Sequence, residues 1–270
     1  FNYLGSLLIT TILTEEPGQT IQNLINSEHS KPISAETDET EVALLFEERN
    51  LISAPVIDEK NQLVGRITID DVVDVIRDQA EHSVMSMVGL DEDEDVFAPI
   101  LLSSRRRSVW LGVNLITAFI AVYFIGLFEA TLQQKIALAI LMPVVASMGG
   151  IAGTQTLIIV TRGIATGRVS AANIRLLINK EVAVSLLNGF IWSIVIGLIT
   201  FYWFSDLLLS FIIALAIIVN LVVAAFSGAF LPLMLTRLKI DPALAGGVIL
   251  TTITDVIGFV AFLGLAALFI

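Results

Sequence analysis

The chain has 270 residues, of which 56% are hydrophobic, and its mean hydropathy is +0.86. A soluble protein of this size does not need so much apolar surface, so the composition predicts a membrane domain. The absence of cysteine excludes disulfides, thiolate metal sites and thiol chemistry. The chain begins at Phe1 with neither a methionine nor a signal-peptide pattern, and we expect it to be a fragment of a longer protein.

Charge and hydropathy both change near residue 104. Residues 1–104 hold 21 Asp and Glu against 5 Lys and Arg, a net charge of −16, and have the composition of a soluble domain. Residues 105–270 hold 5 acidic and 10 basic residues, a net charge of +5, and are mostly apolar. A soluble module this acidic should attract cations and avoid nucleic acid, although a solvated acidic face is the commoner explanation of such an excess.

The soluble part contains an imperfect repeat. Residues 4–9 resemble residues 64–69, and a helical pattern follows each copy. The second copy is complete: the pattern predicts a helix at 41–49, strands at 54–58 and 63–69, and a helix from 70 to about 79. This order of elements resembles a CBS domain. The resemblance makes residues 31–78 one CBS domain and residues 1–30 the C-terminal part of a preceding one.

CBS domains usually sense a ligand, often ATP or another adenine nucleotide. In nucleotide-binding members a Thr or Ser and an Asp three residues later hold ribose and phosphate, and Thr68 and Asp71 fit that pattern. The first copy has Leu8 and Thr11 at those positions and lacks it. Helix capping is the alternative explanation of Asp70 or Asp71.

The helix that starts at Asp70 carries a second signal. Four carboxylates recur on it at helical spacing, at Asp70, Asp71, Asp74 and Asp78, and an acidic run follows at 91–95. Carboxylates on one face repel one another unless a cation lies between them. Hard oxygen ligands favour magnesium or calcium over zinc or copper.

Five apolar segments follow, each long enough to cross a bilayer, which takes roughly 20 residues. They lie near 108–128, 136–161, 181–204, 207–235 and 243–269. Nine of the ten basic residues after residue 104 fall on one side of these segments, and only Lys135 falls on the other. The positive-inside rule then predicts a multi-pass protein with its N-terminal domain in the cytosol and its C-terminus outside.

Asp255 lies about the middle of the last segment. A charge at bilayer depth is costly unless it faces protein, water or an ion. Small and polar residues accompany it at helical spacing, namely Gly247, Thr251, Thr252 and Gly258. The pattern indicates an ion or proton pathway. The alternatives are a buried protonated carboxyl or a basic partner, but no span core contains Lys or Arg.

The second segment shows a matching interruption of its apolar pattern. Pro143, Ser147, Gly150 and Thr154 share one stripe, and we expect Pro143 and the neighbouring glycines to loosen the helix and expose carbonyls to a hydrated cation. Gly149 and Gly153 also form a small-xxx-small pair, whose alternative role is close helix packing.

Three stretches, 65–89, 149–167 and 240–258, resemble the MgtE family of magnesium channels. The resemblance implies an α-helical polytopic membrane protein with five transmembrane helices per subunit and an N-terminal cytosolic α/β CBS module. Residues 79–104 would be an acidic connecting or plug helix region, and residues 105–270 the pore domain. The family assignment implies a homodimer in the bacterial inner membrane that conducts magnesium and is closed by cytosolic magnesium.

The resemblance also assigns residues. Asp255 would be the pore carboxylate, with Thr251 and Gly150 along the same path. Asp70, Asp71 and Asp74 would belong to the cytosolic sensing sites, and Asp241 is counted among the metal ligands. Two departures stand out: many members have asparagines where this chain has Ile151 and Thr154, and this sequence does not include the family's acidic N-terminal domain. Either the sequence is a fragment, as we expect, or this subgroup lacks the domain.

The nearest alternative is a secondary transporter in which Asp255 exchanges a proton or sodium for the metal. A CBS-regulated membrane enzyme is disfavoured, because the only histidines are His29 and His82, both in the soluble part, and the spans hold no catalytic motif. A scaffold that conducts nothing would leave Asp255 unexplained. We therefore expect a channel and no enzymatic activity.

Overall fold

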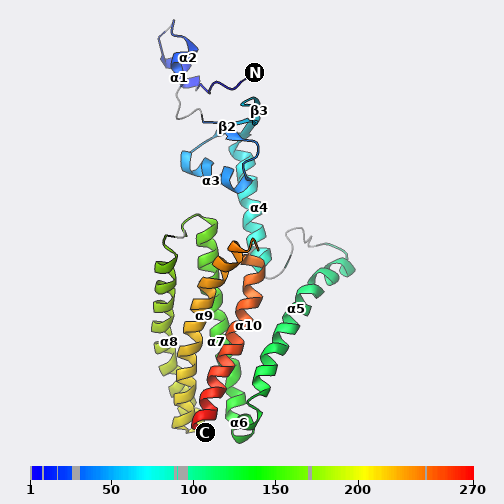
Figure 1. Ribbon diagram of the computed structural model, residues 1–270, viewed down its shortest axis with the longest axis vertical. Coiled ribbons are helices and arrows are strands. Elements are labelled where there is room, and N and C mark those ends of the chain that lie inside the picture. Colours follow the sequence, from blue (N-terminus) through cyan, green and yellow to red (C-terminus); the bar gives the residue numbers. More distant parts are fainter. Residues whose placement is uncertain are drawn as a thin grey trace. The chain divides into compact units, whose positions relative to one another are not determined.

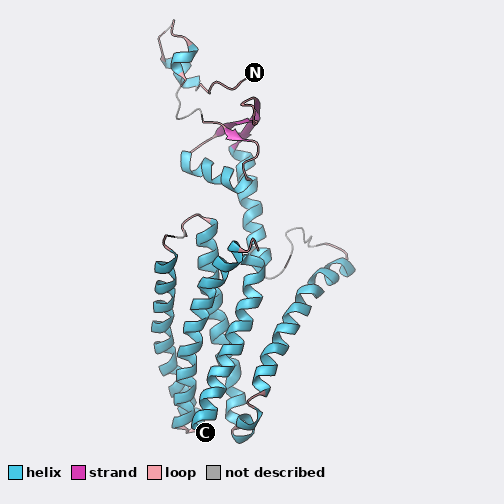
Figure 2. Ribbon diagram, in the orientation of Figure 1, coloured by secondary structure: helices cyan, strands magenta, loops and turns pink. Residues whose placement is uncertain are grey.

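The computed structural model describes residues 2–7, 9–16, 18–25, 31–87, 90, 97–169, 172–240 and 242–270. The chain divides into two compact units, Phe1–Ser83 and Val84–Ile270, and each is described by itself. Among the described residues, strands occur only in the first unit, and long helices make up most of the second (Figures 1 and 2).

The first unit contains a small sheet covered by helices. Its elements are α1 (Ile9–Thr14), α2 (Ile21–Leu24), β1 (Ile33–Ser34), α3 (Glu39–Arg49), β2 (Ser53–Ile57), β3 (Leu63–Thr68) and the start of α4 (Ile69–Met87). The sheet has the order β1-β2-β3, with β1 parallel and β3 antiparallel to β2. Phe46 of α3, Ala54 of β2 and Val72 of α4 close a common core over it. The predicted succession of helix, two strands and helix is confirmed.

Local hydrogen bonds explain where these elements begin and end. The Asp38 carboxylate accepts a hydrogen bond from the Thr40 amide at 2.9 Å and caps α3, and Asn50 ends that helix with a φ of 50°. Asp58 Oδ1 accepts from the amides of Lys60 and Gln62, which closes the turn between β2 and β3. In the first repeat copy, the helix expected after residues 4–9 is α1.

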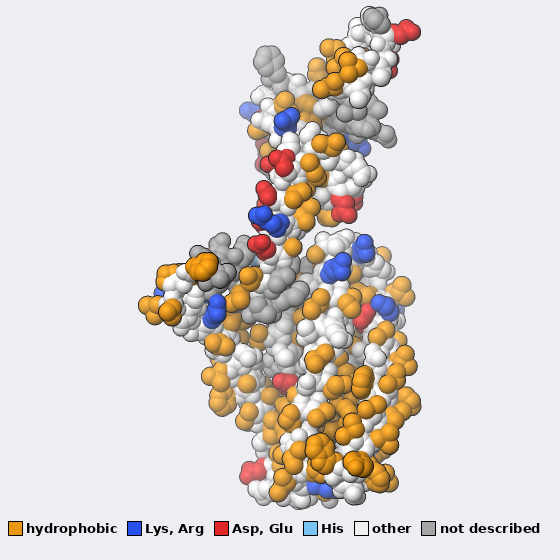
Figure 3. All heavy atoms as spheres, turned by 180° about the vertical axis from the view of Figure 1, so that it is seen from behind, with side chains coloured by type: hydrophobic (Ala, Val, Ile, Leu, Met, Phe, Trp, Pro, Cys, Tyr) orange, Lys and Arg blue, Asp and Glu red, His pale blue; other side chains and the backbone are white. Residues whose placement is uncertain are grey.

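The second unit is built from five helices that are long and apolar enough to cross a membrane, which confirms the five predicted spans. They are α5 (Ile100–Gly126), α7 (Ile136–Ala165), α8 (Ile174–Phe204), α9 (Leu207–Arg237) and α10 (Pro242–Phe269), with a short α6 (Glu129–Gln134) between the first two. Both α5 and α8 begin earlier than predicted, because helical hydrogen bonding continues past the apolar stretch into polar residues. Many large hydrophobic side chains are exposed on this unit, and Figure 3 shows them on one of its faces.

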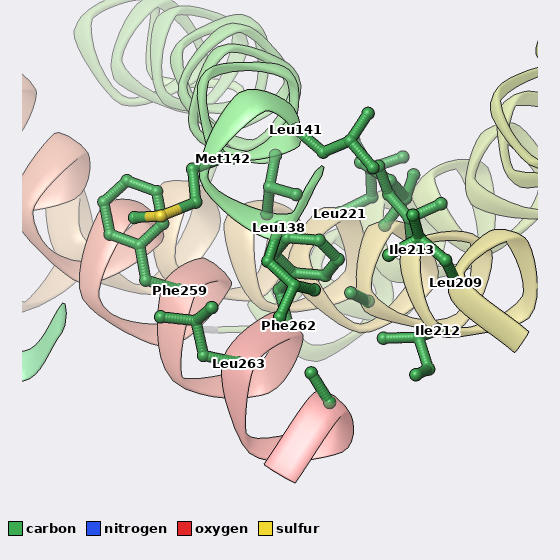
Figure 4. Packing of buried hydrophobic residues seen from close by; sticks show 14 of the residues in the cluster. Leu138, Leu141, Met142, Leu209, Ile212, Ile213, Leu221, Phe259, Phe262 and Leu263 are labelled. Atoms are coloured by element: carbon green, nitrogen blue, oxygen red, sulfur yellow. The ribbon is translucent and has the colours of Figure 1, made fainter. Parts of the chain in front are cut away.

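Helix α9 is the centre of the second unit and packs against α7, α8 and α10. The main core lies where α7, α9 and α10 meet (Figure 4). Leu138 and Met142 of α7, Ile213 of α9, and Phe259 and Phe262 of α10 all contribute to it. The core therefore fixes α7 and α10, which carry the predicted ion-pathway residues, against one common support.

Candidate ion pathway

Asp255 lies in the middle of α10 and is half-buried. Its carboxylate has no hydrogen-bond or ion-pair partner among the residues that the structure describes. A charged group without a protein partner at this depth needs water or a cation beside it. The alternative of a buried basic partner has no support in the described part of the chain, whereas an ion path at Asp255 and a protonated carboxyl there both stay predictions.

Thr251 lies one helical turn before Asp255, and the structure places it next to Gly150 of α7. A Cβ built on Gly150 would lie 3.9 Å from Thr251 Cγ2. The Thr251 hydroxyl donates to the carbonyl of Gly247 at 2.6 Å, and its own carbonyl accepts from the Thr254 hydroxyl at 3.1 Å. The predicted pathway residues of α7 and α10 therefore meet, although the Thr251 hydroxyl already has a partner in its own helix.

The polar stripe predicted on α7 remains open in a single chain. Pro143, Ser147 and Thr154 are exposed, and Gly150 is partly exposed. Pro143 does not interrupt the helix, since α7 is continuous from Ile136 to Ala165. The expected loosening is therefore limited to the single backbone hydrogen bond that a proline cannot donate.

The small residues around the pathway divide into two groups. Thr251 is exposed, whereas Gly258 is buried and faces α9. On α7, Gly150 lies beside Thr251, whereas Gly149 is buried against α9. The predicted stripes therefore contain exposed positions and packing positions side by side, and the packing role considered for Gly149 is confirmed by its contacts.

Asn220 of α9 is a residue that the sequence analysis missed. It is fully buried, and its Nδ2 donates to the Val145 carbonyl of α7 at 2.8 Å, while its Oδ1 has no partner within the described structure. A Cβ on Gly149 would lie 2.3 Å from Asn220 Nδ2, and one on Gly258 would lie 2.7 Å from it. The amide thus fills the space between Gly149 of α7 and Gly258 of α10, and Gly258 lies one turn after Asp255. Its position as the lone amide in an otherwise apolar span was the available signal.

Comparison with known proteins assigns both parts of the chain. The family MgtE, described as a divalent cation transporter, matches residues 142–265, and the CBS domain matches residues 25–78. The chain is 32% identical over 269 residues to the magnesium transporter MgtE of Bacillus subtilis, covering 99% of this chain and 59% of the relative. Residues 142–265 thus match the MgtE family, and the similarity to an MgtE relative extends over nearly the whole chain.

Two further relatives have the same name. The magnesium transporter MgtE of Thermus thermophilus is 30% identical over 268 residues, covering 98% of this chain and 59% of the relative. That of Enterococcus faecalis is 26% identical over 266 residues, covering 98% and 58%. The chain therefore spans a little under three fifths of the length of these MgtE relatives. The family match over residues 142–265 includes Gly150, Thr251, Asp255 and also Asn220.

The MgtE resemblance also placed metal-sensing carboxylates on the first turns of α4. Asp70, Asp71 and Asp74 are all exposed there. Within the described residues, no group of three or more acidic or histidine side chains lies close enough to hold a metal ion. The predicted metal ligand Asp241 lies outside the described residues, as does the acidic run 91–95. In the described part of a single chain, the carboxylates of α4 are therefore separate and do not form a metal-binding site.

Thr68 and Asp71, the predicted nucleotide-binding pair, are bonded to each other. Asp71 Oδ2 accepts from the Thr68 amide at 2.9 Å and from its hydroxyl at 3.0 Å. Since Thr68 immediately precedes α4 and Asp71 is in its first turn, the bond from the Thr68 amide is one of the two reciprocal bonds of a capping box. The structure thus gives both residues a role in starting α4, and nucleotide binding at this pair stays a prediction.

An ion pair joins the connection between α6 and α7 to the connection between α8 and α9. Lys135, between α6 and α7, pairs with Asp206, which precedes α9. Asp206 also accepts from the Leu209 amide at 3.0 Å. The Leu209 amide first, and Lys135 second, hold the pKa of Asp206 below its usual value. The charged form of this carboxylate therefore stabilises the junction of α7 and α9.

We expect Asp206→Asn to lower the thermal unfolding temperature of the purified protein at pH 7 and to flatten its acid dependence. Because the folded-state pKa is depressed, the stabilisation is complete above the unfolded pKa of about 4 and is lost as pH falls through the lower folded value. Unfolding scans in detergent from pH 7 to pH 3 measure this. Glu129→Gln, at an exposed carboxylate of α6, is the control; equal acid slopes in both variants and the parent would contradict the assignment.

Proposed function

We propose that this chain is the regulated conducting part of a magnesium channel. The observation that carries the proposal is Asp255, half-buried and unpaired within the described part of α10, beside the Gly150–Thr251 contact. Magnesium holds its water shell strongly, so a carboxylate with adjacent carbonyls and hydroxyls suits a hydrated ion. The names of the MgtE relatives, which are magnesium transporters, support the choice of ion.

The proposal includes a homodimer. The face that carries Gly150 and Thr251 is open on a single chain, and Pro143, Ser147 and Thr154 are exposed along it. Polar positions in a membrane helix avoid lipid, so a second surface must cover them. A second copy of the chain related by a twofold axis supplies an identical stripe and places two Asp255 carboxylates across one path.

The proposed orientation places the CBS module in the cytosol and the C-terminus outside, as the bias of basic residues indicates. Arg105, Arg106 and Arg107 and the basic residues between α7 and α8 lie on that cytosolic side, and the Lys135–Asp206 pair lies on the other. The relatives are bacterial proteins, and a bacterial inner membrane is the compartment we propose.

Flux measurements on proteoliposomes test the conducting role. With magnesium, voltage and pH varied separately, a channel passes magnesium down its electrochemical gradient and is insensitive to the pH gradient. A requirement for a proton or sodium gradient would instead identify the coupled transporter, in which the unpaired Asp255 carries the exchanged ion. Folded protein that passes no magnesium in any of these conditions would contradict both.

We propose that the exposed carboxylates of α4 report cytosolic magnesium and favour a closed state when it binds. The first 104 residues carry a net charge of −16, so bound cations relieve self-repulsion that otherwise holds such modules apart. Residues 79–104 would transmit the change as a plug across the pore. ATP at Thr68 and Asp71 is expected to lower the magnesium concentration needed for closure, and adding ATP to the flux assay tests this.

We expect Asp70→Asn combined with Asp74→Asn to raise the magnesium concentration that half-inhibits flux by at least about fivefold, the lower end of common coupling energies. Asp71 is left intact because it caps α4. The control, Glu47→Gln with Glu48→Gln, removes the same charge from exposed positions of α3. Flux with internal magnesium varied is the measurement. An equal shift in the control would show a general charge effect, and no shift in either would remove α4 from the sensing role.

A further inference from the structure

A basic pocket lies at the turn between α7 and α8, away from the ion pathway. It has a volume of about 710 Å³. Three cationic side chains line it, Arg162 from α7, Arg168 from the turn and Lys180 from α8, and its remaining wall is largely apolar, with Ile159 and Leu177 among the contributors. The pocket therefore combines cationic side chains with an apolar wall that α7 and α8 contribute.

Specific contacts involve the described residues of this turn, which end at Val169 and resume at Ala172. The Val169 amide donates to the Gly163 carbonyl at 2.9 Å, and a Cβ on Gly163 would lie 2.6 Å from Val169 Cγ2. Asn173 Nδ2 donates to the Arg168 carbonyl at 2.8 Å. The segment that ends at Val169 thus folds back against the end of α7, and Arg168 lines the same hollow as Arg162.

The pocket keeps a positive charge. Lys180 Nζ pairs with Glu181 at 3.1 Å, and the Glu181 side chain is almost completely buried. Arg162 and Arg168 have no acidic partner in the described part of the chain. After Lys180 and Glu181 neutralise each other, two guanidinium groups remain available for an anion. Guanidinium groups bind phosphate with paired hydrogen bonds.

A second hollow of about 440 Å³ continues along the α7–α8 groove and shares Ile159 with the first. Beside Glu181 it is lined by uncharged polar side chains, including Gln155 and Asn188, and farther along by Met148 and Trp192. Since α8 packs on α9 and makes few contacts with α7, this groove is left open. Apolar side chains line both hollows, and among the others the cationic ones lie at the Arg162 end and the uncharged polar ones toward Asn188, which is the order of phosphate and ester along the acyl chains of a phospholipid.

We propose that the α7–α8 groove binds one anionic phospholipid, with its phosphate on Arg162 and Arg168 and an acyl chain along Met148 and Trp192. The membrane leaflet at the end of the helices that carries most of the basic residues is the one rich in anionic lipid. The positive-inside bias accounts for basic residues on this side, but not for two of them converging on a pocket that continues into a groove lined by polar and apolar side chains. The proposal requires only that the helices span the membrane, so it stands apart from magnesium conduction.

Native mass spectrometry of the purified chain with phosphatidylglycerol or phosphatidylcholine tests the site. Arg162→Gln combined with Arg168→Gln is expected to weaken phosphatidylglycerol binding by about 30-fold, from roughly fivefold for each basic residue near an anionic surface. Arg237→Gln combined with Lys239→Gln removes the same charge from the α9 end, outside the groove, and is expected to retain binding. Arg162→Lys with Arg168→Lys keeps the charge and checks that the turn still folds.

Soluble glycerophosphoglycerol separates a lipid from a free phosphate. The proposal expects no retained binding of that headgroup without acyl chains, and Trp192→Ala is expected to weaken binding of the lipid. Binding of the soluble headgroup as tight as that of the lipid would identify a free phosphate ester and overturn the lipid assignment. An equal loss of phosphatidylglycerol binding in the control variant at Arg237 and Lys239 would overturn it as well. So would a parent protein that binds phosphatidylglycerol no better than phosphatidylcholine, which is expected if a second copy of the chain fills the groove.

Discussion

Asp255→Ala is expected to reduce magnesium flux in proteoliposomes by at least about 100-fold while the protein stays folded. The two carboxylates of the proposed dimer supply the negative charge that attracts a divalent ion into a low-dielectric path, where such charge interactions are worth several kcal/mol. Asp255 has no partner among the described side chains, so its removal leaves no buried cation unpaired. The loss should therefore appear in conduction and not in stability.

Two further variants and a check of the fold make this test specific. Asp206→Asn removes a carboxylate outside the pathway and is expected to keep its flux, and thermal unfolding of each variant in detergent checks the fold. Asp255→Glu retains the charge with a longer side chain and is expected to conduct more than Asp255→Ala. Normal flux from a folded Asp255→Ala variant would contradict the pathway, since the ion would then cross without the one carboxylate at mid-span.

The number and order of elements could be predicted because they depend on local patterns. Five long apolar runs identify the spans, and the alternation around residues 54–58 and 63–69 identifies the hairpin. Helix ends were less accurate where a helix continues into polar residues, as at the start of α5. Hydropathy reports where the bilayer ends, whereas backbone hydrogen bonding decides where the helix ends.

Asp255 could be found in the sequence because a carboxylate in an apolar run is unusual. The different roles of Gly149 and Gly150 could not be predicted, because the two glycines are adjacent in sequence and face different helices. The burial of Asn220 depends on which face of α9 meets α7 and α10, and a helix that is apolar all round does not reveal this face. For Thr68 and Asp71, a capping box and a nucleotide pair share one sequence pattern, and the structure shows the capping contacts.

Gly149→Ala is expected to destabilise the second unit by about 1–3 kcal/mol, the usual cost of overpacking a tight interior. The added Cβ would lie 2.3 Å from Asn220 Nδ2. The amide has little room to move, because it donates to the Val145 carbonyl and is bounded on its other side by Gly258. Either the hydrogen bond breaks or α7 moves away from α9, and the second change would also shift Gly150 against Thr251.

Asn220→Ala provides the decisive second step, because it removes the atoms that Gly149→Ala would strike. Val145 can still bond within α7, so this substitution alone should cost little, as for most polar contacts between membrane helices. The double variant is expected to regain most of the stability lost in Gly149→Ala. Gly112→Ala in α5, where an added Cβ meets nothing within 4 Å, should be neutral or mildly stabilising. Thermal unfolding of these four variants is the measurement. Equal losses of stability in Gly149→Ala and in the double variant would show that Asn220 does not set the spacing between α7 and α9. Asn220 would then not position the helices that carry Gly150 and Asp255.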